Sequence, residues 1–310
     1  MKIAIILFNL GGPDSLDAVQ PFLRNLFGDP AILRLPSLIR RPLASLLARR
    51  RAPKAREIYA KIGGSSPILG QTEAQARALE EALGSEHEWR AYVCMRYWHP
   101  MTEAVVRSVK RFAPDRIVLL PLYPQFSTTT TASSFKAWDD TAPFKVPTTV
   151  VKDYPTEPGF IAASVELVKQ GLAEAGAGPK RVLFSAHGLP ERIVKAGDPY
   201  QAQIEQTADA IAQHLEGVDW SVCYQSRVGP LKWIGPSTEA EIQRAGADKM
   251  GVVLYPVSFV SEHSETLVEL DIDYRRLAEI DGVPIYVRVP TVGTHPLFIA
   301  GLARLVRDAV

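Results

Sequence analysis

The chain is poor in several features that would indicate a function directly. Its 310 residues include two cysteines, Cys94 and Cys223, too few for a disulfide framework or a four-cysteine metal site. The formal net charge of +1 gives no reason to expect a nucleic-acid ligand. No apolar run reaches the roughly 20 residues that cross a bilayer. This composition predicts a globular protein in a reducing, cytoplasmic setting.

The signature motifs of several common enzyme classes are also absent. The sequence has no G-x-G-x-x-G loop, no phosphate-binding lysine loop, no H-E-x-x-H zinc motif and no G-x-S-x-G serine motif. These absences argue against the familiar forms of nucleotide binding and serine hydrolysis. The apolar start, MKIAIILFNLGGP, is followed by no small-residue cleavage site. We therefore interpret it as a buried strand that ends in a turn, and not as a signal peptide.

Apolar, β-branched runs alternate with helical patterns along the chain. The runs predict strands at 3–9, 90–95, 116–122, 148–152, 181–186, 219–224, 250–255 and 284–288. Continuous apolar strands that alternate with helices are typical of parallel sheets covered on both faces. We therefore predict an α/β protein of two similar Rossmann-like domains, each a parallel sheet flanked by helices, with an active-site cleft between them.

The duplication is visible in the sequence itself. Two pairs of segments are alike, 113–134 with 246–266 and 5–13 with 182–190. This similarity predicts a first domain at 1–150 and a second at 151–294, followed by an amphipathic helix at 295–310 that could pack on either. Ligands of such folds bind beyond the carboxyl ends of the strands. Polar motifs at those ends are therefore the candidates for a site.

One such motif is FSAHGLPER (184–192), in which His187 directly follows a predicted buried strand. A histidine at this place titrates near neutrality and suits a proton acceptor or a metal ligand. A hydrogen-bonded histidine with a purely structural role in the turn is an equally good interpretation of these residues alone.

A second motif, SFVSEHSETLVELDIDY, carries five carboxylates and one histidine. Glu265, Glu269 and Asp273 recur every fourth position, a spacing at which like charges destabilise a helix by roughly 0.2–0.5 kcal/mol per pair. The helix dipole favours acids at a helix start, which accounts for Glu262 and Glu265 but not for the later two. A solvated acidic face and a path for a cation remain the alternatives. Imidazole with carboxylate suits Fe²⁺ or a similar divalent ion, and does not suit a closed tetrahedral zinc site.

Two further segments carry aromatic or basic residues. MRYWHPMTEA (95–104) and YPQFSTTTTASSF (123–135) place aromatic rings and Arg96 at strand ends, a mixture that a large flat ligand with carboxylates would use. Ordinary packing at the strand ends is the alternative. The segment 34–54 combines leucines on one helical face with arginines, and Pro42 should kink or restart any helix there. It fits either an anionic membrane surface or a helix that covers the core.

Taken together, the motifs resemble those of ferrochelatase, the enzyme that inserts Fe²⁺ into a porphyrin late in haem synthesis. The resemblance covers essentially the whole chain, and seven motifs in the family's order make it specific. They are NLGGP (9–13), RRAPKAREIYAKIGGSSPI (50–68), RYWHPMTE (96–103), YPQFSTTTTASS (123–134), SAHGLPER (185–192), YQSRVGPLKWIGP (224–236) and SFVSEHSETLVELD (258–271).

The resemblance implies roles for the acidic and histidine residues. His187 matches the active-site histidine that accepts pyrrole protons or binds the incoming metal, Glu265 its essential acidic partner, and His263 the histidine beside it. Glu269 and Asp273 match an acidic ladder that leads outwards. The implied catalytic residues are thus His187, Glu265 and His263, and the implied metal ligands are His187, Glu265, Glu269 and Asp273. The family's helix at this position has a π-type widening.

Other matched positions imply contacts with the porphyrin. Arg51 and Ser66 match residues that hold its propionates. Leu10 stands where a branch that uses coproporphyrin carries a tyrosine, which favours protoporphyrin IX. The matched pocket-wall positions are Arg96, Tyr97, Tyr123 and Trp233. Residues 35–51 match the lip over the active site, which touches the bilayer in membrane-associated members, and the C-terminal helix is expected to return to the first domain.

The resemblance therefore implies a lyase that converts protoporphyrin IX and Fe²⁺ into protohaem and two protons. No organic cofactor is implied, and no [2Fe–2S] cluster is expected because members that hold one use four cysteines. We expect a cytoplasmic monomer with peripheral contact at the inner face of the cytoplasmic membrane and no nucleic-acid partner. The alternatives are a coproporphyrin III ferrochelatase, a non-catalytic porphyrin or haem carrier, and a related chelatase such as one for cobalt and sirohydrochlorin.

Overall fold

The computed structural model describes residues 1–227 and 231–310. They form two compact units, residues 1–153 with 302–310 and residues 154–301. The first join lies close to the expected one at 150, whereas the second falls inside the C-terminal helix α11 (Pro296–Asp308). The central part of the motif at 224–236, residues 228–230, lies outside the described residues. Within that described part, no helix is both long and apolar enough to cross a membrane.

The first unit is built on a four-stranded parallel sheet in the order β2-β1-β3-β4. Its strands are β1 (Lys2–Asn9), β2 (Glu88–Met95), β3 (Arg116–Pro121) and β4 (Thr148–Val150). In the register of the sheet, Asn9 lies opposite Met95, and Phe8 lies opposite Pro121. Strands β1, β2 and β3 therefore end at the same level. The segments that follow them, which carry the sequence motifs at 9–13, 96–103 and 123–134, leave from one edge of the sheet.

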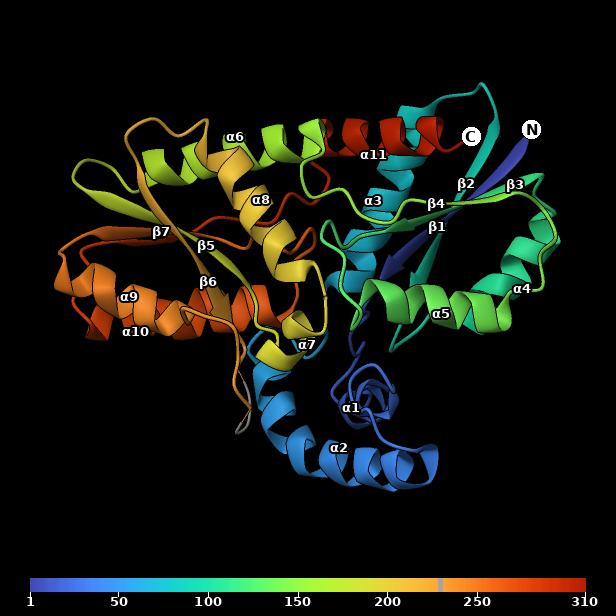
Figure 1. The fold of residues 1–310 in the computed structure, drawn as a ribbon, viewed down its shortest axis with the longest axis horizontal. Helices are drawn as coiled ribbons and strands as arrows, with labels where there is room; N and C mark the ends of the chain where they lie inside the picture. Colours follow the sequence, from blue (N-terminus) through green and yellow to red (C-terminus); the bar gives the residue numbers. More distant parts are fainter. Residues whose placement is uncertain (228–230) are drawn as a thin grey trace. The chain divides into compact units, whose positions relative to one another are not determined.

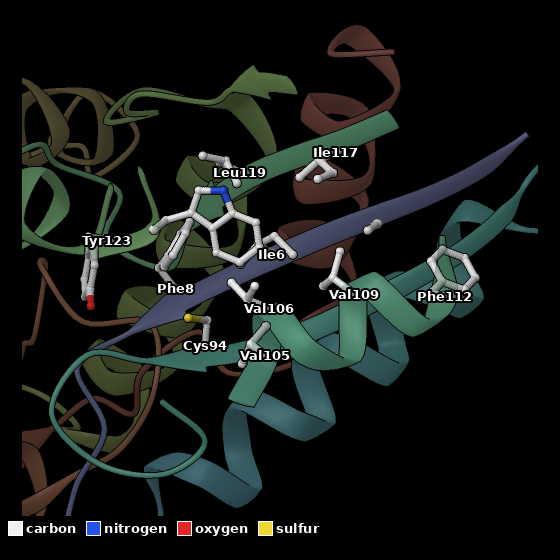
Figure 2. Packing of buried hydrophobic residues seen from close by; sticks show 12 residues of the cluster. Ile6, Phe8, Cys94, Val105, Val106, Val109, Phe112, Ile117, Leu119 and Tyr123 are labelled. Atoms are coloured by element: carbon white, nitrogen blue, oxygen red, sulfur yellow. The ribbon is translucent and has the colours of Figure 1, made fainter. Parts of the chain in front are cut away.

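An apolar cluster joins this sheet to helices α4 (Thr102–Phe112) and α5 (Thr131–Thr141). On α4, Val105, Val109 and Phe112 are spaced at helical intervals and are buried against the apolar side chains of β1 and β3. Burial of each such side chain stabilises the fold by about 1.5–3 kcal/mol. Figure 2 shows Tyr123 at one end of this cluster, beyond the strands.

Helix α2 (Ser37–Ala60) does not restart at Pro42, one of the two outcomes predicted for this segment. One helix runs on through Pro42 and Pro53, and it is bent along its length (Figure 1). The N–H that Pro42 lacks would have bonded to the carbonyl of Leu38, one turn earlier. Leu38 itself lies on the exposed side of the helix, with 88% of its surface accessible.

The buried face of α2 is made of small residues and not of leucines. Ala44, Ala48 and Ala52 are buried at every fourth position, and the last two pack against Phe22 and Leu23 of helix α1 (Val19–Gly28). Short side chains let the two helices approach closely. The large apolar side chains of this segment that remain exposed are Leu35, Leu38, Ile39 and Leu46. These leucines therefore do not cover the core of the unit.

The second unit repeats the plan with the strand order β6-β5-β7-β8, again all parallel. Its strands are β5 (Lys180–His187), β6 (Asp219–Gln225), β7 (Gly251–Tyr255) and β8 (Tyr286–Arg288). Helices α6 (Pro158–Glu174) and α8 (Tyr200–Ala212) cover one face of the sheet, and α9 (Thr238–Ala247) and α10 (Tyr274–Ile280) cover the other (Figure 1). Each expected strand is found in the described residues, and the predicted α/β fold of two parallel sheets flanked by helices is confirmed.

Candidate active site

His187 is the last residue of β5, at the carboxyl end of the second sheet. It lies opposite Gln225, the last residue of β6. Immediately afterwards, the Gly188 N–H donates to the Gln225 carbonyl at 2.9 Å. A Cβ at Gly188 would lie 3.0 Å from that carbonyl oxygen and 3.3 Å from the ring of Trp233. The glycine thus lets the chain turn tightly and fixes where the imidazole leaves the sheet.

Glu265 provides the partner of this imidazole. Its Oε2 lies 2.9 Å from His187 Nδ1. Burial acts against a charged imidazolium, but the Glu265 carboxylate, its hydrogen bond and the charge of Glu269 outweigh it, so the pKa of His187 is raised. Burial likewise opposes ionisation of Glu265, yet His187 and His263 outweigh it and lower the pKa of Glu265 to about 2. The side chains are 41% and 30% exposed, so solvent screens the pair and reactants can reach it.

Glu265 begins a π-helix, η1 (Glu265–Asp273), as the family resemblance implied. Its second acid, Glu269, is joined to the first through Ser226. The Ser226 N–H donates to Glu269 Oε1 at 2.9 Å, and the Ser226 hydroxyl contacts both Glu269 Oε2 and, at 3.3 Å, Glu265 Oε2. Burial and the neighbouring Glu265 raise the pKa of Glu269, against the hydrogen bonds from Ser226. Contacts thus lead from His187 to the carboxylate of Glu265 and, through Ser226, to that of Glu269.

The contacts continue beyond Glu269 towards the surface. The hydroxyl oxygen of Tyr274 lies 3.1 Å from Glu269 Oε1 and 3.1 Å from Glu239 Oε1. Glu239 is exposed in the first turn of α9. Asp273, which the resemblance placed on the outward ladder, is exposed at the last position of η1. Neither Tyr274 nor Glu239 was singled out from the sequence.

The two remaining acids of the stretch 258–274, Glu262 and Asp271, are each paired with an arginine. Glu262 Oε1 lies 2.6 Å from Arg288 Nη1 and accepts the N–H of Thr291 at 3.0 Å. Asp271 pairs with Arg275 at 2.6 Å. The expectation that Glu262 starts the helix is therefore wrong, because it precedes the helix and pairs with an arginine of β8. The sequence gives no local sign of this pairing, because Arg288 lies 26 residues along the chain from Glu262.

His263 lies beside the pair, just before η1. Its ring packs against Phe259 with a centroid distance of 4.5 Å, and its Nδ1 lies 3.2 Å from the carbonyl oxygen of Ser261. Its charge is one of the influences that lower the pKa of Glu265. The three catalytic residues implied by the resemblance are therefore neighbours within the second unit.

Arg96, the expected pocket cation of the first unit, has a fixed orientation. Its Nη2 lies 2.8 Å from Oδ2 of the buried Asp29, and its Nε donates to Ser133 Oγ at 2.7 Å. Tyr97 is almost fully buried, and its hydroxyl donates to the same Asp29 oxygen at 2.9 Å. Asp29 and Ser133 were not identified from the sequence, because nothing local marks a pairing over such separations.

The remaining expected porphyrin contacts differ in their surroundings. Leu10 is half-buried where two apolar clusters of the first unit meet. Ser66 packs so closely on Gly12 that a Cβ there would lie 2.5 Å from it. Arg51 is exposed on α2, and Tyr123 is buried, which raises its pKa.

Trp233, the pocket-wall position of the second unit, forms an isolated bridge with Pro190. Its ring approaches Gly188, so the structure brings Trp233 beside the turn that follows His187.

The candidate metal ligands do not form a closed centre. Contacts connect His187, Glu265 and Glu269, but within residues 1–227 and 231–310 no group of three or more His, Cys, Asp or Glu side chains is arranged to hold a metal ion. What the geometry offers is an accessible histidine–carboxylate pair with a second carboxylate behind it. Such a pair can accept a proton and provide oxygen and nitrogen ligands to a cation in transit.

Comparisons with known proteins identify the family of the chain. The family model for ferrochelatase matches residues 2–310. A ferrochelatase from Caulobacter vibrioides (strain NA1000 / CB15N) is 56% identical over 314 residues, which cover 100% of this chain and 90% of the relative. One from Phenylobacterium zucineum is 51% identical over 315 residues, with 100% and 92% covered.

A solved structure shares the fold at much lower identity. The sirohydrochlorin chelatase SirB from Bacillus subtilis subspecies spizizenii, in complex with cobalt, aligns with a TM-score of 0.57 at 11% identity, over 100% of this chain and 95% of SirB. At that identity the likeness concerns the fold alone. The family match and the two relatives extend over nearly the full length. The chain belongs to the ferrochelatase family.

Proposed function

We propose that this protein inserts Fe²⁺ into protoporphyrin IX and releases protohaem and two protons. The pair of His187 and Glu265 is the observation that carries the proposal, in a chain whose relatives are named ferrochelatases. A free porphyrin holds two inner N–H protons that must leave before a divalent metal can bind the four nitrogens. The reaction therefore needs a base, a route for protons and weak ligands for the metal.

His187 is the proposed base. With Nδ1 hydrogen-bonded to Glu265, its Nε2 is the nitrogen left to accept a pyrrole proton. Glu265, with its lowered pKa, stays ionised and stabilises the imidazolium that forms. His263 adds a further imidazole next to this carboxylate. We assign catalytic roles to these three residues.

Glu265, Glu269 and Asp273 are the proposed carriers of charge along η1. Fe²⁺ exchanges water for imidazole and carboxylate ligands and passes to the porphyrin nitrogens, with His187 as a further ligand. These ligands must bind iron loosely, because a site that held the ion tightly would not release it to the macrocycle. The same carboxylates can take protons away, since the raised pKa of Glu269 makes it a readier proton acceptor than Glu265.

The porphyrin itself is the proposed ligand of the apolar and basic positions. Arg51 and Ser66 hold the propionates. Bending the ring exposes the nitrogen lone pairs to the metal, and contacts at the periphery of the ring offset that strain. Leu10, with no hydroxyl, favours protoporphyrin IX over coproporphyrin III. The proposed wall positions are Arg96, Tyr97, Tyr123 and Trp233.

The segment 35–51 is the proposed contact with an anionic membrane surface. Support comes from Leu38, Ile39 and Leu46, which are exposed although they are large and apolar, on a helix that also carries arginines. We further propose a monomer that resides in the cytoplasm and associates peripherally with the membrane.

One anaerobic assay tests the central proposal. Purified protein is supplied with Fe²⁺ and either protoporphyrin IX or coproporphyrin III, each in large excess over the protein, and haem formation is followed by absorbance. Many turnovers with protoporphyrin IX are expected, with a lower kcat/KM for coproporphyrin III. A spectral change that stops at one equivalent would instead indicate a carrier, and a preference for coproporphyrin III would contradict the assigned substrate.

A further inference from the structure

A chain of buried polar side chains lies beneath the pair of His187 and Glu265. Ser185, two residues before His187 on β5, is fully buried, as are Gln225 at the end of β6 and Thr238 at the start of α9. Ser185 Oγ lies 2.5 Å from Gln225 Oε1 and 2.8 Å from Thr238 Oγ1. Buried polar groups are costly unless they are hydrogen-bonded, so three of them in a row require an explanation.

The hydrogen bonds among Ser185, Gln225 and Thr238 can run in one direction only. A carboxamide oxygen only accepts, so the Ser185 hydroxyl must donate its single proton to Gln225 Oε1. Ser185 then accepts from Thr238, whose hydroxyl supplies the proton. With Oε1 held by Ser185, the orientation of the carboxamide is fixed and its Nε2 is turned away from Ser185. The donors thus run from Thr238 through Ser185 to the NH₂ group of Gln225.

His187 lies opposite Gln225 in the sheet and Ser226 follows Gln225 in the chain, so this glutamine is next to both residues that bond to Glu265. Gln225 Nε2 is buried and makes no hydrogen bond of ordinary geometry within the part of the chain that the structure describes. The Gln225 side chain is also among the groups that lower the pKa of Glu265. His187 and Ser226 both bond to Glu265 Oε2, which leaves Oε1 for the carboxamide. Hydrogen bonds at active sites are often long before substrate binds and tighten in the complex.

We propose that Gln225, oriented by Ser185 and Thr238, is a positioning residue that holds the Glu265 carboxylate towards His187. This inference rests on the proposed function, because it assigns a task within the same reaction. Without the carboxamide, Glu265 keeps bonds at one oxygen only and can rotate about its last torsion. The imidazole then loses its fixed partner, although His187 and Glu265 are both still present.

The test compares Gln225→Leu, which has similar bulk but no N–H, with the wild-type protein. Groups that orient a ligating or catalytic side chain are typically worth 10–100-fold in activity. We therefore expect kcat for iron insertion to fall about 10–100-fold, with KM for the porphyrin unchanged within about twofold, because Gln225 is placed behind the pair and not against the macrocycle.

Two further variants separate positioning from packing. Ser164→Ala removes a hydroxyl that is also fully buried in the second unit and bonded to Tyr255 at 2.7 Å. Ser164 belongs to α6, on the opposite face of the sheet from α9, which carries Thr238. It should lower stability without lowering kcat. Ser185→Ala frees the carboxamide to rotate and should lower kcat at a similar cost in stability. If Gln225→Leu does not fold, Ser185→Ala alone decides the question.

A measurement without turnover keeps the inference independent of the proposed function. In ¹⁵N-labelled protein without metal, at one neutral pH, the imidazole signal of His187 is identified by its absence in His187→Ala. We expect the Nδ1 proton of His187 to shift upfield and exchange faster in Gln225→Leu and Ser185→Ala, but not in Ser164→Ala. Unchanged His187 signals, or a loss of kcat no greater than in Ser164→Ala, would overturn the assignment. A wild-type protein that forms no haem would refute the proposed function and leave the NMR result to decide the role of Gln225.

Discussion

Ser226 holds the Glu269 carboxylate with both its backbone N–H and its hydroxyl, and it does so from a left-handed backbone conformation with φ of 58°. Residues other than glycine rarely adopt this conformation, which costs an L-residue roughly 1–2 kcal/mol. Unusual backbone of this kind is concentrated at functional sites. Here it directs two donors from one residue onto the second carboxylate behind His187.

Replacing Ser226 with two small residues separates the backbone cost from the hydroxyl. Ser226→Gly and Ser226→Ala both lose the hydroxyl, but only glycine adopts positive φ freely. We expect the alanine variant to be less stable than the glycine variant by about 1 kcal/mol, measured from urea unfolding. Equal stability would mean that the loop changes its conformation when the hydroxyl is absent.

His187→Ala should abolish iron insertion and leave the protein folded. The imidazole is the proposed proton acceptor and is 41% exposed, so its removal creates no large cavity in the core. Haem formation under anaerobic conditions and circular dichroism are the two measurements. Haem formation near the wild-type rate would show that His187 is not the base.

Glu265→Gln should move the acid limb of the pH–rate profile to lower pH and also reduce the maximal rate. The base must be neutral to accept a proton, so activity is lost as the pH falls through the pKa of His187. That pKa is raised because the Glu265 carboxylate outweighs burial. Without the carboxylate, burial is opposed only by Glu269, the pKa of His187 falls, and neutral imidazole persists to lower pH.

The matched control for this pH experiment is Glu239→Gln. Glu239 is an exposed acid at the far end of the same contacts, beyond Tyr274. Profiles of kcat/KM against pH are measured for the wild-type protein, Glu265→Gln and Glu239→Gln. The acid limb should move to lower pH in Glu265→Gln alone. A limb at the wild-type position in Glu265→Gln would contradict the assignment of that limb to His187.

Membrane contact through α2 can be tested with charge substitutions on its exposed leucine face. Leu38→Asp with Ile39→Asp should weaken binding to vesicles that contain anionic phosphatidylglycerol by more than tenfold, since each buried apolar side chain contributes about 1.5–3 kcal/mol. Ile280→Asp alters a similarly exposed residue, 73% accessible, on α10 outside this segment. In co-sedimentation, Ile280→Asp should bind the vesicles as the wild type does. An equal loss of binding in Ile280→Asp and in the double variant would argue against membrane contact through α2.

The strands and the order of the motifs were predictable because their signals are local. A buried parallel strand is apolar along its whole length, so runs such as 181–186 and 250–255 indicate strands without knowledge of their neighbours. The helix through Pro42 was not predictable in this way. A proline can either kink a helix or end it, and the residues around Pro42 do not show which of the two occurs.

Part of the site was predictable because its signals, like those of the strands, are local. His187 and Glu265 each follow a recognisable strand, and the family resemblance connected them. Gln225 and Ser226 lie in a motif that was noticed without a chemical reason, although the rule about carboxyl ends of strands points to them. Parallel register, which places Gln225 opposite His187, is not encoded in either strand alone.

The pairing of Glu262 with Arg288 was also not predictable from the sequence. It leads to a prediction about stability. The two side chains are 12% and 11% exposed, and their charged atoms are 2.6 Å apart. Removing one member of such a pair leaves a buried charge without its partner, which typically costs about 3–5 kcal/mol. We therefore expect Arg288→Met to lower the free energy of unfolding by about 3 kcal/mol.

Arg275→Met is the control for this prediction. Arg275 also pairs with an acid of the same stretch, Asp271 at 2.6 Å, but it is 45% exposed. Exposed pairs contribute about 0–1 kcal/mol, so this variant should unfold almost as the wild type does in urea. The double variant Glu262→Gln with Arg288→Met should recover part of the loss, because no charge is then left buried. If Arg288→Met were no less stable than Arg275→Met, the pairing of Glu262 with Arg288 would not contribute to the stability of the fold.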